Sequence, residues 1–254
     1  MKKIALIVIL SVVALSLRAE GGVDSRALWE RAGRLYTAGD YNGAAATYDS
    51  IVNEGLESAE LYYNLGCSYF KAGKSGRAIL NYHRAQRLAP ADGDIAYNLA
   101  YAESFVKDKI DEVPEFATTR LLGSAKNLVS VDCWGVLSLV MLALALIAIL
   151  FYLLSQRRAI RKTGFVVGIV ATFLLLCTVG LGASARRTLL SEDEAIVLST
   201  AAVVKASPER TGKDLFILHE GTKVEVLDSF GEWSEIRIAD GNEGWIRSSS
   251  IEII

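Results

Sequence analysis

Two long stretches without a charged residue limit the fold of this chain more than any other feature of its sequence. Residues 133–154 and 163–185 are almost entirely apolar. As α-helices they would each be roughly 33–35 Å long, enough to cross a hydrocarbon core of about 30 Å. A helix that is apolar on every face for about six turns is rare inside a soluble protein. We therefore expect transmembrane helices over 133–154 and 163–185.

The segment between these runs, 155–162, is short and basic. It contains no acid, and short loops rich in Lys and Arg usually remain in the cytoplasm. We therefore expect a cytoplasmic loop, with both flanking parts of the chain across the membrane. Gly164 and Gly168 have the spacing of a close helix contact, although isolated pairs of this kind arise as often by chance. The four cations of the loop are Arg157, Arg158, Arg161 and Lys162.

The N-terminus has the pattern of a secretory signal peptide over residues 1–19. Lys2 and Lys3 precede a short apolar run, and Ala19 offers a small residue at the cleavage position. Leu17 is larger than the residue usual near such a site, which leaves an uncleaved N-terminal anchor as the alternative. A signal peptide would carry the following residues across the membrane, in agreement with a cytoplasmic loop at 155–162.

The composition argues against several classes of function. The chain has 52% hydrophobic residues, a mean hydropathy of +0.31, and 27 Lys and Arg against 29 Asp and Glu. The two parts expected to lie in water, 20–120 and 188–254, are both acidic, so no basic field would recruit nucleic acid. Three cysteines cannot form a disulfide framework, and His83 and His219 are the only histidines. We expect no catalytic residue, metal or cofactor, and we expect His83 to be exposed.

Residues 59–90 have the pattern of two paired helices. Apolar residues recur every three or four positions, Gly73 interrupts them, and Pro90 ends the second half. Gly66 would let the two helices approach closely. The spacing resembles the tetratricopeptide repeat (TPR) family. The residues that carry this resemblance are Tyr62, Leu65, Gly66, Tyr69, Ala78, Tyr82, Ala85 and Pro90.

The repeat extends in both directions. Asn64-Leu65 recurs as Asn98-Leu99 after 34 residues, and the segment around Trp29 and Tyr48 resembles an earlier copy. A last helix near 94–107 would cap the apolar face of the array. We expect TPR-like helical repeats over 24–108.

Members of the TPR family bind peptide segments in a groove lined by the first helix of each repeat. The resemblance implies that polar and aromatic residues of those helices contact the ligand, and the alternative is that they only solvate the exposed face. Glu30 and Asp94 stand where chaperone-binding members have lysines, so that specificity is not expected. The candidate groove residues are Arg31, Tyr63, Asn64, Tyr97 and Asn98.

Residues 109–132 lead into the first apolar run. Leu121, Leu122 and Leu128 are scattered among polar residues after Pro114. This favours an amphipathic elbow at the membrane interface, and a plain linker is the alternative.

The C-terminal segment, 192–254, changes to a period of two, which is typical of half-buried strands. The residues Gly221, Trp233 and Gly244-Trp245-Ile246 resemble the bacterial SH3 (SH3b) domain family. We expect a small barrel with Trp245 in its core, whereas Trp233 is either at the core edge or on a ligand-facing surface. The resemblance implies binding of protein or of peptidoglycan.

The expected architecture is therefore a multi-domain membrane protein with an α-helical TPR solenoid, two transmembrane helices and a C-terminal all-β, SH3-like barrel. This order resembles the BatE proteins of the Bacteroides aerotolerance operon over nearly the full length. The resemblance implies a non-enzymatic scaffold of the bacterial inner membrane, with both terminal domains in the periplasm. Its partners would be von Willebrand A-domain membrane proteins of the same operon, and its neighbours there include a MoxR-type ATPase. The residues leave open a peptidoglycan-binding module, and two distant histidines argue against a wall hydrolase.

Overall fold

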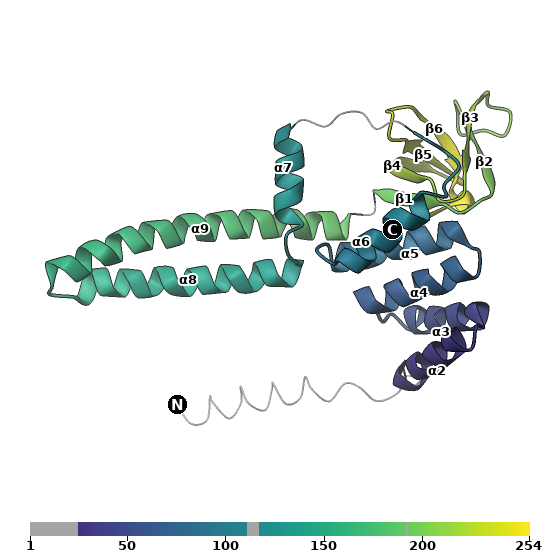
Figure 1. The fold of residues 1–254 in the computed structure, drawn as a ribbon. Coiled ribbons are helices and arrows are strands. Elements are labelled where there is room, and N and C mark those ends of the chain that lie inside the picture. Colours follow the sequence, from purple (N-terminus) through teal and green to yellow (C-terminus); the bar gives the residue numbers. More distant parts are fainter. Residues whose placement is uncertain (1–24, 111–116, 192) are drawn as a thin grey trace, which may run out of the picture. The chain divides into compact units, whose positions relative to one another are not determined.

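The computed structural model describes residues 25–110, 117–191 and 193–254 (Figure 1). The signal peptide expected over 1–19 lies outside the described residues, as do positions 111–116 of the expected elbow and Glu192 of the SH3-like segment. The chain divides into two compact units, one ending at Glu57 and the other covering Ser58–Ile254.

The first unit contains a pair of helices, α2 (Ser25–Thr37) and α3 (Tyr41–Asn53). Asp40 caps α3 by accepting a hydrogen bond from the Gly43 N–H at 2.9 Å. The rings of Trp29 and Tyr48 meet edge to face at 5.4 Å between centroids. Packing through these aromatic rings and buried alanines gives the helix pair that the sequence predicts before residue 58.

The second unit begins with three helices, α4 (Ala59–Lys71), α5 (Ser75–Leu88) and α6 (Gly93–Glu103). A Cβ atom at Gly66 would lie 2.7 Å from a ring carbon of Tyr82, so glycine permits the close approach of α4 and α5. Leu65 and Tyr82 are almost completely buried between these helices. The expected exposure of His83 is wrong, because this residue is only 8% exposed and its ring lies beside Glu103.

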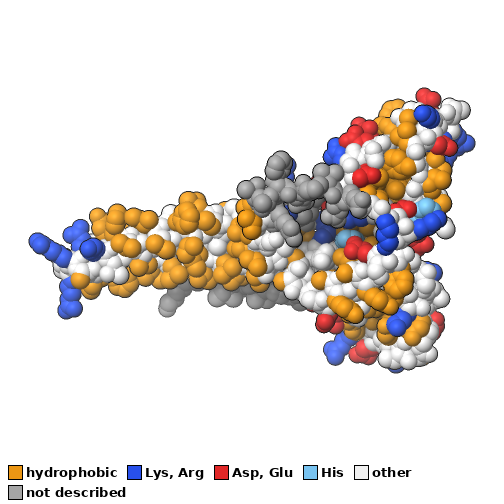
Figure 2. Space-filling model, turned by 45° about the horizontal axis from the view of Figure 1, so that its top comes forward, with side chains coloured by type: hydrophobic (Ala, Val, Ile, Leu, Met, Phe, Trp, Pro, Cys, Tyr) orange, Lys and Arg blue, Asp and Glu red, His pale blue; other side chains and the backbone are white. Residues whose placement is uncertain are grey.

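Two long helices follow a short one. α7 (Ala117–Lys126) precedes α8 (Val131–Leu154) and α9 (Arg158–Leu190), which lie side by side as a hairpin (Figure 1). A Cβ atom at Gly164 would lie 2.9 Å from the Ala148 carbonyl oxygen, so of the two interpretations left open for the glycine spacing, the structure favours close helix contact over chance. By length and composition, α8 and α9 are able to cross a membrane. Most of their apolar side chains are exposed, unlike those of a core helix (Figure 2).

The C-terminal part is one antiparallel sheet. Its strand order is β3-β2-β6-β5-β4-β1-β7. Since β3 and β7 are the two edges in this order, the predicted barrel is not closed by hydrogen bonds. The strands are β1 (Glu194–Val197), β2 (Ala201–Lys205), β3 (Asp214–His219), β4 (Lys223–Phe230), β5 (Trp233–Arg237), β6 (Glu243–Arg247) and β7 (Ile251–Ile253), with a 3₁₀ turn at Ser248–Ser250 before β7.

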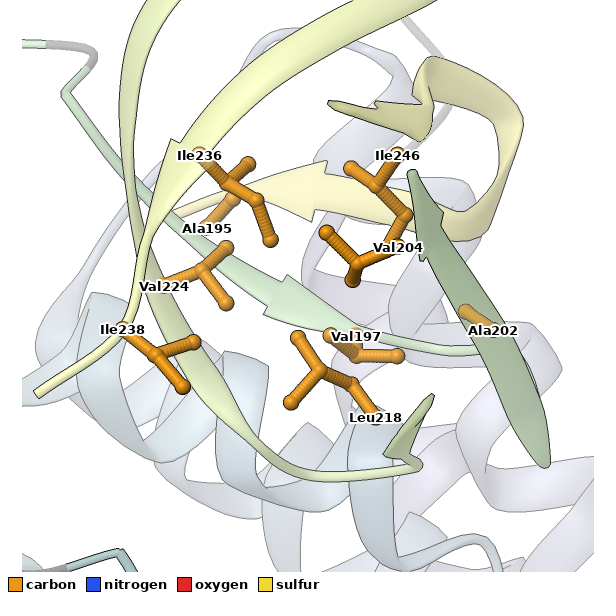
Figure 3. Close-up of a cluster of buried hydrophobic side chains, with 9 residues drawn as sticks. All are labelled: Ala195, Val197, Ala202, Val204, Leu218, Val224, Ile236, Ile238 and Ile246. Atoms are coloured by element: carbon orange, nitrogen blue, oxygen red, sulfur yellow. The ribbon is translucent and has the colours of Figure 1, made fainter. Parts of the chain in front are cut away.

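One face of the sheet surrounds a small aliphatic core (Figure 3). In β6, Gly244 and Ile246 are buried, Ile246 belongs to this core, and Trp245 between them is half-buried. The expectation that Trp245 belongs to the core is therefore wrong, because neighbouring strand residues face opposite sides. The core contains Ala195, Val197, Ala202, Val204, Leu218, Val224, Ile236, Ile238 and Ile246.

Both ends of helix α5 contact the C-terminal part that contains the sheet. The Glu220 carboxylate accepts a hydrogen bond at 2.8 Å from the Gly76 N–H in the first turn of α5, where free amide groups favour an anion. Near the other end, Arg84 forms an ion pair with Glu252 at 3.0 Å and donates to the Ile253 carbonyl oxygen at 2.6 Å. The second helix of the repeat and the sheet therefore share an interface within one compact unit.

Candidate functional site

The strongest candidate site is the face formed by α4 and by α6 with the residues just after it. On α4, Tyr63, Asn64, Cys67 and Phe70 are half-buried, whereas Leu65, Gly66 and Tyr69 are buried. The helical period thus turns one side of α4 toward the core and leaves an aromatic and polar side accessible. We call this side, with the facing residues of α6 and Phe105, the α4–α6 face.

Hydrogen bonds connect the two helices at this face. The side-chain amide of Asn98 donates to the Tyr63 hydroxyl at 3.0 Å and to the Asp94 carbonyl oxygen at 2.8 Å. Burial, followed by the neighbouring Cys67 thiol and the carboxylates of Asp94 and Asp92, raises the pKa of Tyr63 to about 12. The Tyr63 phenol is therefore protonated at neutral pH.

An aromatic cluster occupies the other end of the face. The Phe70 ring lies 5.7 Å from that of Tyr101 and 5.9 Å from that of Phe105. Tyr101 and Phe105 meet edge to face at 5.1 Å. Together with Tyr97 one turn earlier, these residues expose a large aromatic area, with Tyr97 71%, Tyr101 50% and Phe105 60% accessible. Exposed rings of this size are typical of binding anchors.

The structure brings together four of the five candidate groove residues. Tyr63 and Asn64 lie on α4, and Tyr97 and Asn98 lie on α6, where Asn98 is bonded to Tyr63. Arg31 is exposed on α2, in the other compact unit. Phe70, Tyr101 and Phe105 belong to this face but were not among the residues predicted from the sequence. The signal was present, because aromatic residues at 97, 101 and 105 recur at the spacing of one helix face.

Trp233, the candidate on the SH3-like part, is only 8% exposed. The Arg247 guanidinium lies over its ring, 5.5 Å from the centroid. Of the two interpretations left open by the sequence, this burial favours a packing residue over a ligand contact.

A second polar cluster, which the sequence analysis also missed, lies where the residues after α6 meet the sheet. Asp108 accepts hydrogen bonds from the His219 ring at 2.6 Å, the His219 N–H at 2.6 Å and the Thr222 hydroxyl at 2.7 Å. Lys107 approaches the other ring nitrogen at 2.9 Å. Burial opposes ionisation of Asp108, but the three hydrogen bonds outweigh it and lower the pKa of this carboxyl.

The hydrogen bonds of Asp108 connect the residues after α6 to the sheet, which is a structural role rather than a reactive one. Every oxygen of its carboxylate is engaged by the protein, and Lys107 occupies the outer side of the ring. Within residues 25–110, 117–191 and 193–254, no group of three or more His, Cys, Asp or Glu side chains could hold a metal ion.

Comparison with known proteins gives the same reading of two regions. Residues 59–92 match the tetratricopeptide repeat family, and residues 200–252 match the bacterial SH3 domain family. No curated protein is similar enough in sequence to count as a relative. The two matching families typically serve as binding modules without catalysis. The chain thus combines a region similar to TPR, two helices able to cross a membrane, and a region similar to bacterial SH3 domains.

Proposed function

We propose that this protein is a non-enzymatic, membrane-anchored adaptor whose α4–α6 face binds an extended segment of a protein partner. The observation that carries the proposal is the exposed aromatic cluster of Tyr97, Tyr101 and Phe105. The half-buried Phe70 ring packs against the rings of Tyr101 and Phe105. Rigid aromatic side chains lose little conformational entropy on binding and bury a large area. The match of α4 and α5 to a family of interaction repeats supports the same conclusion.

The ligand expected from this surface is an extended segment with apolar or aromatic side chains. Phe70, Tyr101 and Phe105 would contact those side chains, while Asn64 at the other end would contact the backbone. The Asn98 amide nitrogen already donates to the Tyr63 hydroxyl of α4 and to the Asp94 carbonyl oxygen of its own helix. We therefore assign Asn98 to positioning the face rather than to direct contact.

The proposed arrangement in the membrane has α8 and α9 as two spans and the loop that joins them in the cytoplasm. Its support is the exposed apolar surface of both helices and the cations at their junction. The helical and SH3-like parts would then lie in the periplasm of the bacterial inner membrane. α7, which exposes Leu121 and Leu122, fits an elbow at the interface.

The partners follow from the resemblance to BatE proteins. They would be von Willebrand A-domain membrane proteins, in a complex that supports tolerance of oxidative or envelope stress. A second candidate function is binding of peptidoglycan through the SH3-like part, which the match over residues 200–252 supports. Sedimentation of the chain with purified sacculi distinguishes peptidoglycan binding from the adaptor function. A peptidoglycan-binding chain would sediment with the sacculi, whereas a protein-binding adaptor would remain in the supernatant.

Photo-crosslinking in cells tests the adaptor function. A photoreactive amino acid replaces Tyr97, at the edge of the aromatic cluster, and in a parallel strain replaces Phe230, which is 66% exposed on β4 of the sheet. Position 97 should yield a specific crosslinked protein, and position 230 should not. The double variant Tyr101→Ser/Phe105→Ser should weaken capture of that protein at least tenfold, since each anchor ring contributes on the order of 1–2 kcal/mol.

The matched control is Phe230→Ser, which removes an equally exposed ring elsewhere on the chain. It should leave both the crosslink and the capture unchanged. Unaltered capture by Tyr101→Ser/Phe105→Ser, with an unaltered circular dichroism spectrum, would contradict the α4–α6 face as the binding site.

A further inference from the structure

The hairpin of α8 and α9 contains an apolar cavity at the end where the two helices are joined. Its volume is about 420 Å³, within the ~300–1,000 Å³ range of ligand sites. Both helices contribute to it, and aliphatic and aromatic side chains dominate its surface. Among the lining residues are Leu144, Ile147 and Phe151 of α8 and Ala159, Thr163 and Val167 of α9.

Basic residues surround the same end of the hairpin. Arg157, Arg158, Arg161 and Lys162 are all exposed, and Figure 2 shows the positive charge at this tip next to the apolar shaft. The Arg161 guanidinium lies over the Tyr152 ring, 5.4 Å from its centroid, which holds this cation beside the helix pair.

These cations lack a carboxylate partner within their part of the chain. Residues 133–191 contain no Asp or Glu. In the part of the chain that the structure describes, none of the four enters an ion pair. The positive-inside preference accounts for the sign of the charge, but it does not account for an apolar cavity next to it.

We propose that this end of the hairpin is a binding site for an anionic phospholipid. An acyl chain fills the apolar cavity between α8 and α9, and the phosphate group lies among Arg157, Arg158, Arg161 and Lys162. A phospholipid satisfies both halves of the site with one molecule, because its apolar chain and its anion are covalently joined. The inference rests on the proposed insertion of α8 and α9 into a membrane.

Native mass spectrometry of the full chain, purified in detergent, tests the site. The probes are phosphatidylglycerol and phosphatidylethanolamine with identical acyl chains, so that the two lipids differ only in the headgroup, which is anionic in the first and zwitterionic in the second. Phosphatidylglycerol should bind at least several-fold more tightly. Arg157→Gln/Arg158→Gln should lower its affinity on the order of tenfold and leave phosphatidylethanolamine nearly unchanged.

The chain offers matched controls for both halves of the site. Arg186→Gln/Arg187→Gln removes an adjacent pair of exposed arginines at the opposite end of α9, and it should not change the preference. Ala159→Phe fills the cavity and should reduce binding of both lipids. Ala143→Phe adds the same ring to an exposed position of α8 and should have no such effect.

Three results would overturn the lipid site. They are equal affinity for the two lipids, equal loss in the two arginine variants, or a change of oligomeric mass in Ala159→Phe without a change in lipid binding, which would assign the cavity to a second chain. Alkaline carbonate extraction of membranes tests insertion separately. A chain that is extracted contradicts the proposed membrane arrangement, whereas a chain that resists extraction and shows no lipid preference contradicts only this inference.

Discussion

At the scale of single residues, Gly66 sets the distance between α4 and α5. The Cβ atom of an alanine there would lie 2.7 and 2.8 Å from two ring carbons of Tyr82 and 3.3 Å from the Ala78 carbonyl oxygen. Since Tyr82 is buried, its ring has little room to move. Gly66→Ala should therefore lower the free energy of unfolding by about 1–3 kcal/mol through overpacking.

The control for this change is Gly33→Ala, in the middle of α2, where nothing lies within 4 Å of the added Cβ atom. Alanine should stabilise that helix by roughly 0.5–1 kcal/mol because it favours helical backbone more than glycine does. Thermal unfolding followed by circular dichroism measures both. If the two substitutions had the same effect, close packing at Gly66 would be the wrong explanation.

The Asp108 carboxylate should make stability depend on pH. Its pKa is lowered in the folded chain, so the stabilisation is fully present above the ordinary Asp pKa of ~3.9 and is lost as the pH falls through the lowered value. Asp108→Asn should cost about 1–3 kcal/mol at pH 7, because it weakens bonds from His219 and Thr222 to a charged acceptor.

Unfolding midpoints of the two proteins, measured from pH 7 to pH 3, check this prediction. The difference should hold to about pH 5 and shrink below about pH 4. Asp228→Asn, at an exposed position of β4, should show no comparable difference. A difference for Asp108→Asn that grew toward acid pH would have the wrong sign.

Residue environments were only partly predictable from the sequence. The helical period correctly placed Leu65 and Tyr82 in the core of the repeat. Their burial depends only on packing within the pair of α4 and α5, which the period describes. His83 and Trp245 could not be placed in this way. His83 is buried beside Glu103 at the end of the next helix, and the side of β6 that Trp245 occupies depends on the register of the whole sheet.

At the scale of elements, Arg87 links α5 to the end of α9 and to the residue after β7. Its guanidinium donates to the Ser191 carbonyl oxygen at 2.9 Å and also to that of Leu189, at the end of α9 where carbonyl groups have no helical partner. It donates as well to the Ile254 carbonyl oxygen, just after β7. One side chain therefore holds the second helix of the repeat, the end of α9 and the last strand together.

Arg87→Ala should loosen the attachment of α5 to the end of α9 and to the residue after β7, while α9 and the sheet stay folded. Hydrogen exchange should become faster at residues 188–191 and 251–254, and it should stay unchanged in the core strand β5. Arg87→Lys should rescue little, because the three donors of an ammonium group lie on one nitrogen, whereas the guanidinium spreads five donors over three nitrogens and so reaches acceptors farther apart. Arg34→Ala, with a side chain 71% exposed on α2, is the control and should leave all of these rates unchanged. Unchanged exchange at 188–191 in Arg87→Ala would show that this cap does not hold α9.

Elements were easier to predict than their ends and their partners. The two uncharged runs indicated α8 and α9, but α9 begins at Arg158 and ends at Leu190, so it includes charged residues on both sides of 163–185. Lack of charge marks the part of a helix that suits a membrane, not the point where its backbone hydrogen bonds end. The contacts of α5 with the sheet left no periodic signal, since Arg84 and Glu252 are far apart in the sequence.

At the scale of the whole molecule, two observations bear on the proposed arrangement of the chain in a membrane. α8 and α9 form a hairpin, so the start of α8 and the end of α9 lie at the same end of the helix pair. If the hairpin crosses a membrane, these two ends therefore lie on the same side of it. The segments before and after this hairpin also bond to each other, through Arg84 with Glu252 and Asp108 with His219. Both observations favour one common side for the helical repeat and the sheet, with the tip at Arg157 and Arg158 on the other.

Reporter fusions test this arrangement. An enzyme that is active only outside the cytoplasm should work when fused after Ile254 and fail when inserted after Ala159, near the cations of the tip. A reporter that is active only in the cytoplasm should show the opposite pattern at the same two positions. The charge of the tip should control the outcome, so replacing Arg157, Arg158, Arg161 and Lys162 by Gln should yield a mixed population at both positions. Activity of the first reporter at Ala159 but not at Ile254 would reverse the arrangement, and it would place the α4–α6 face in the cytoplasm together with every partner proposed for it.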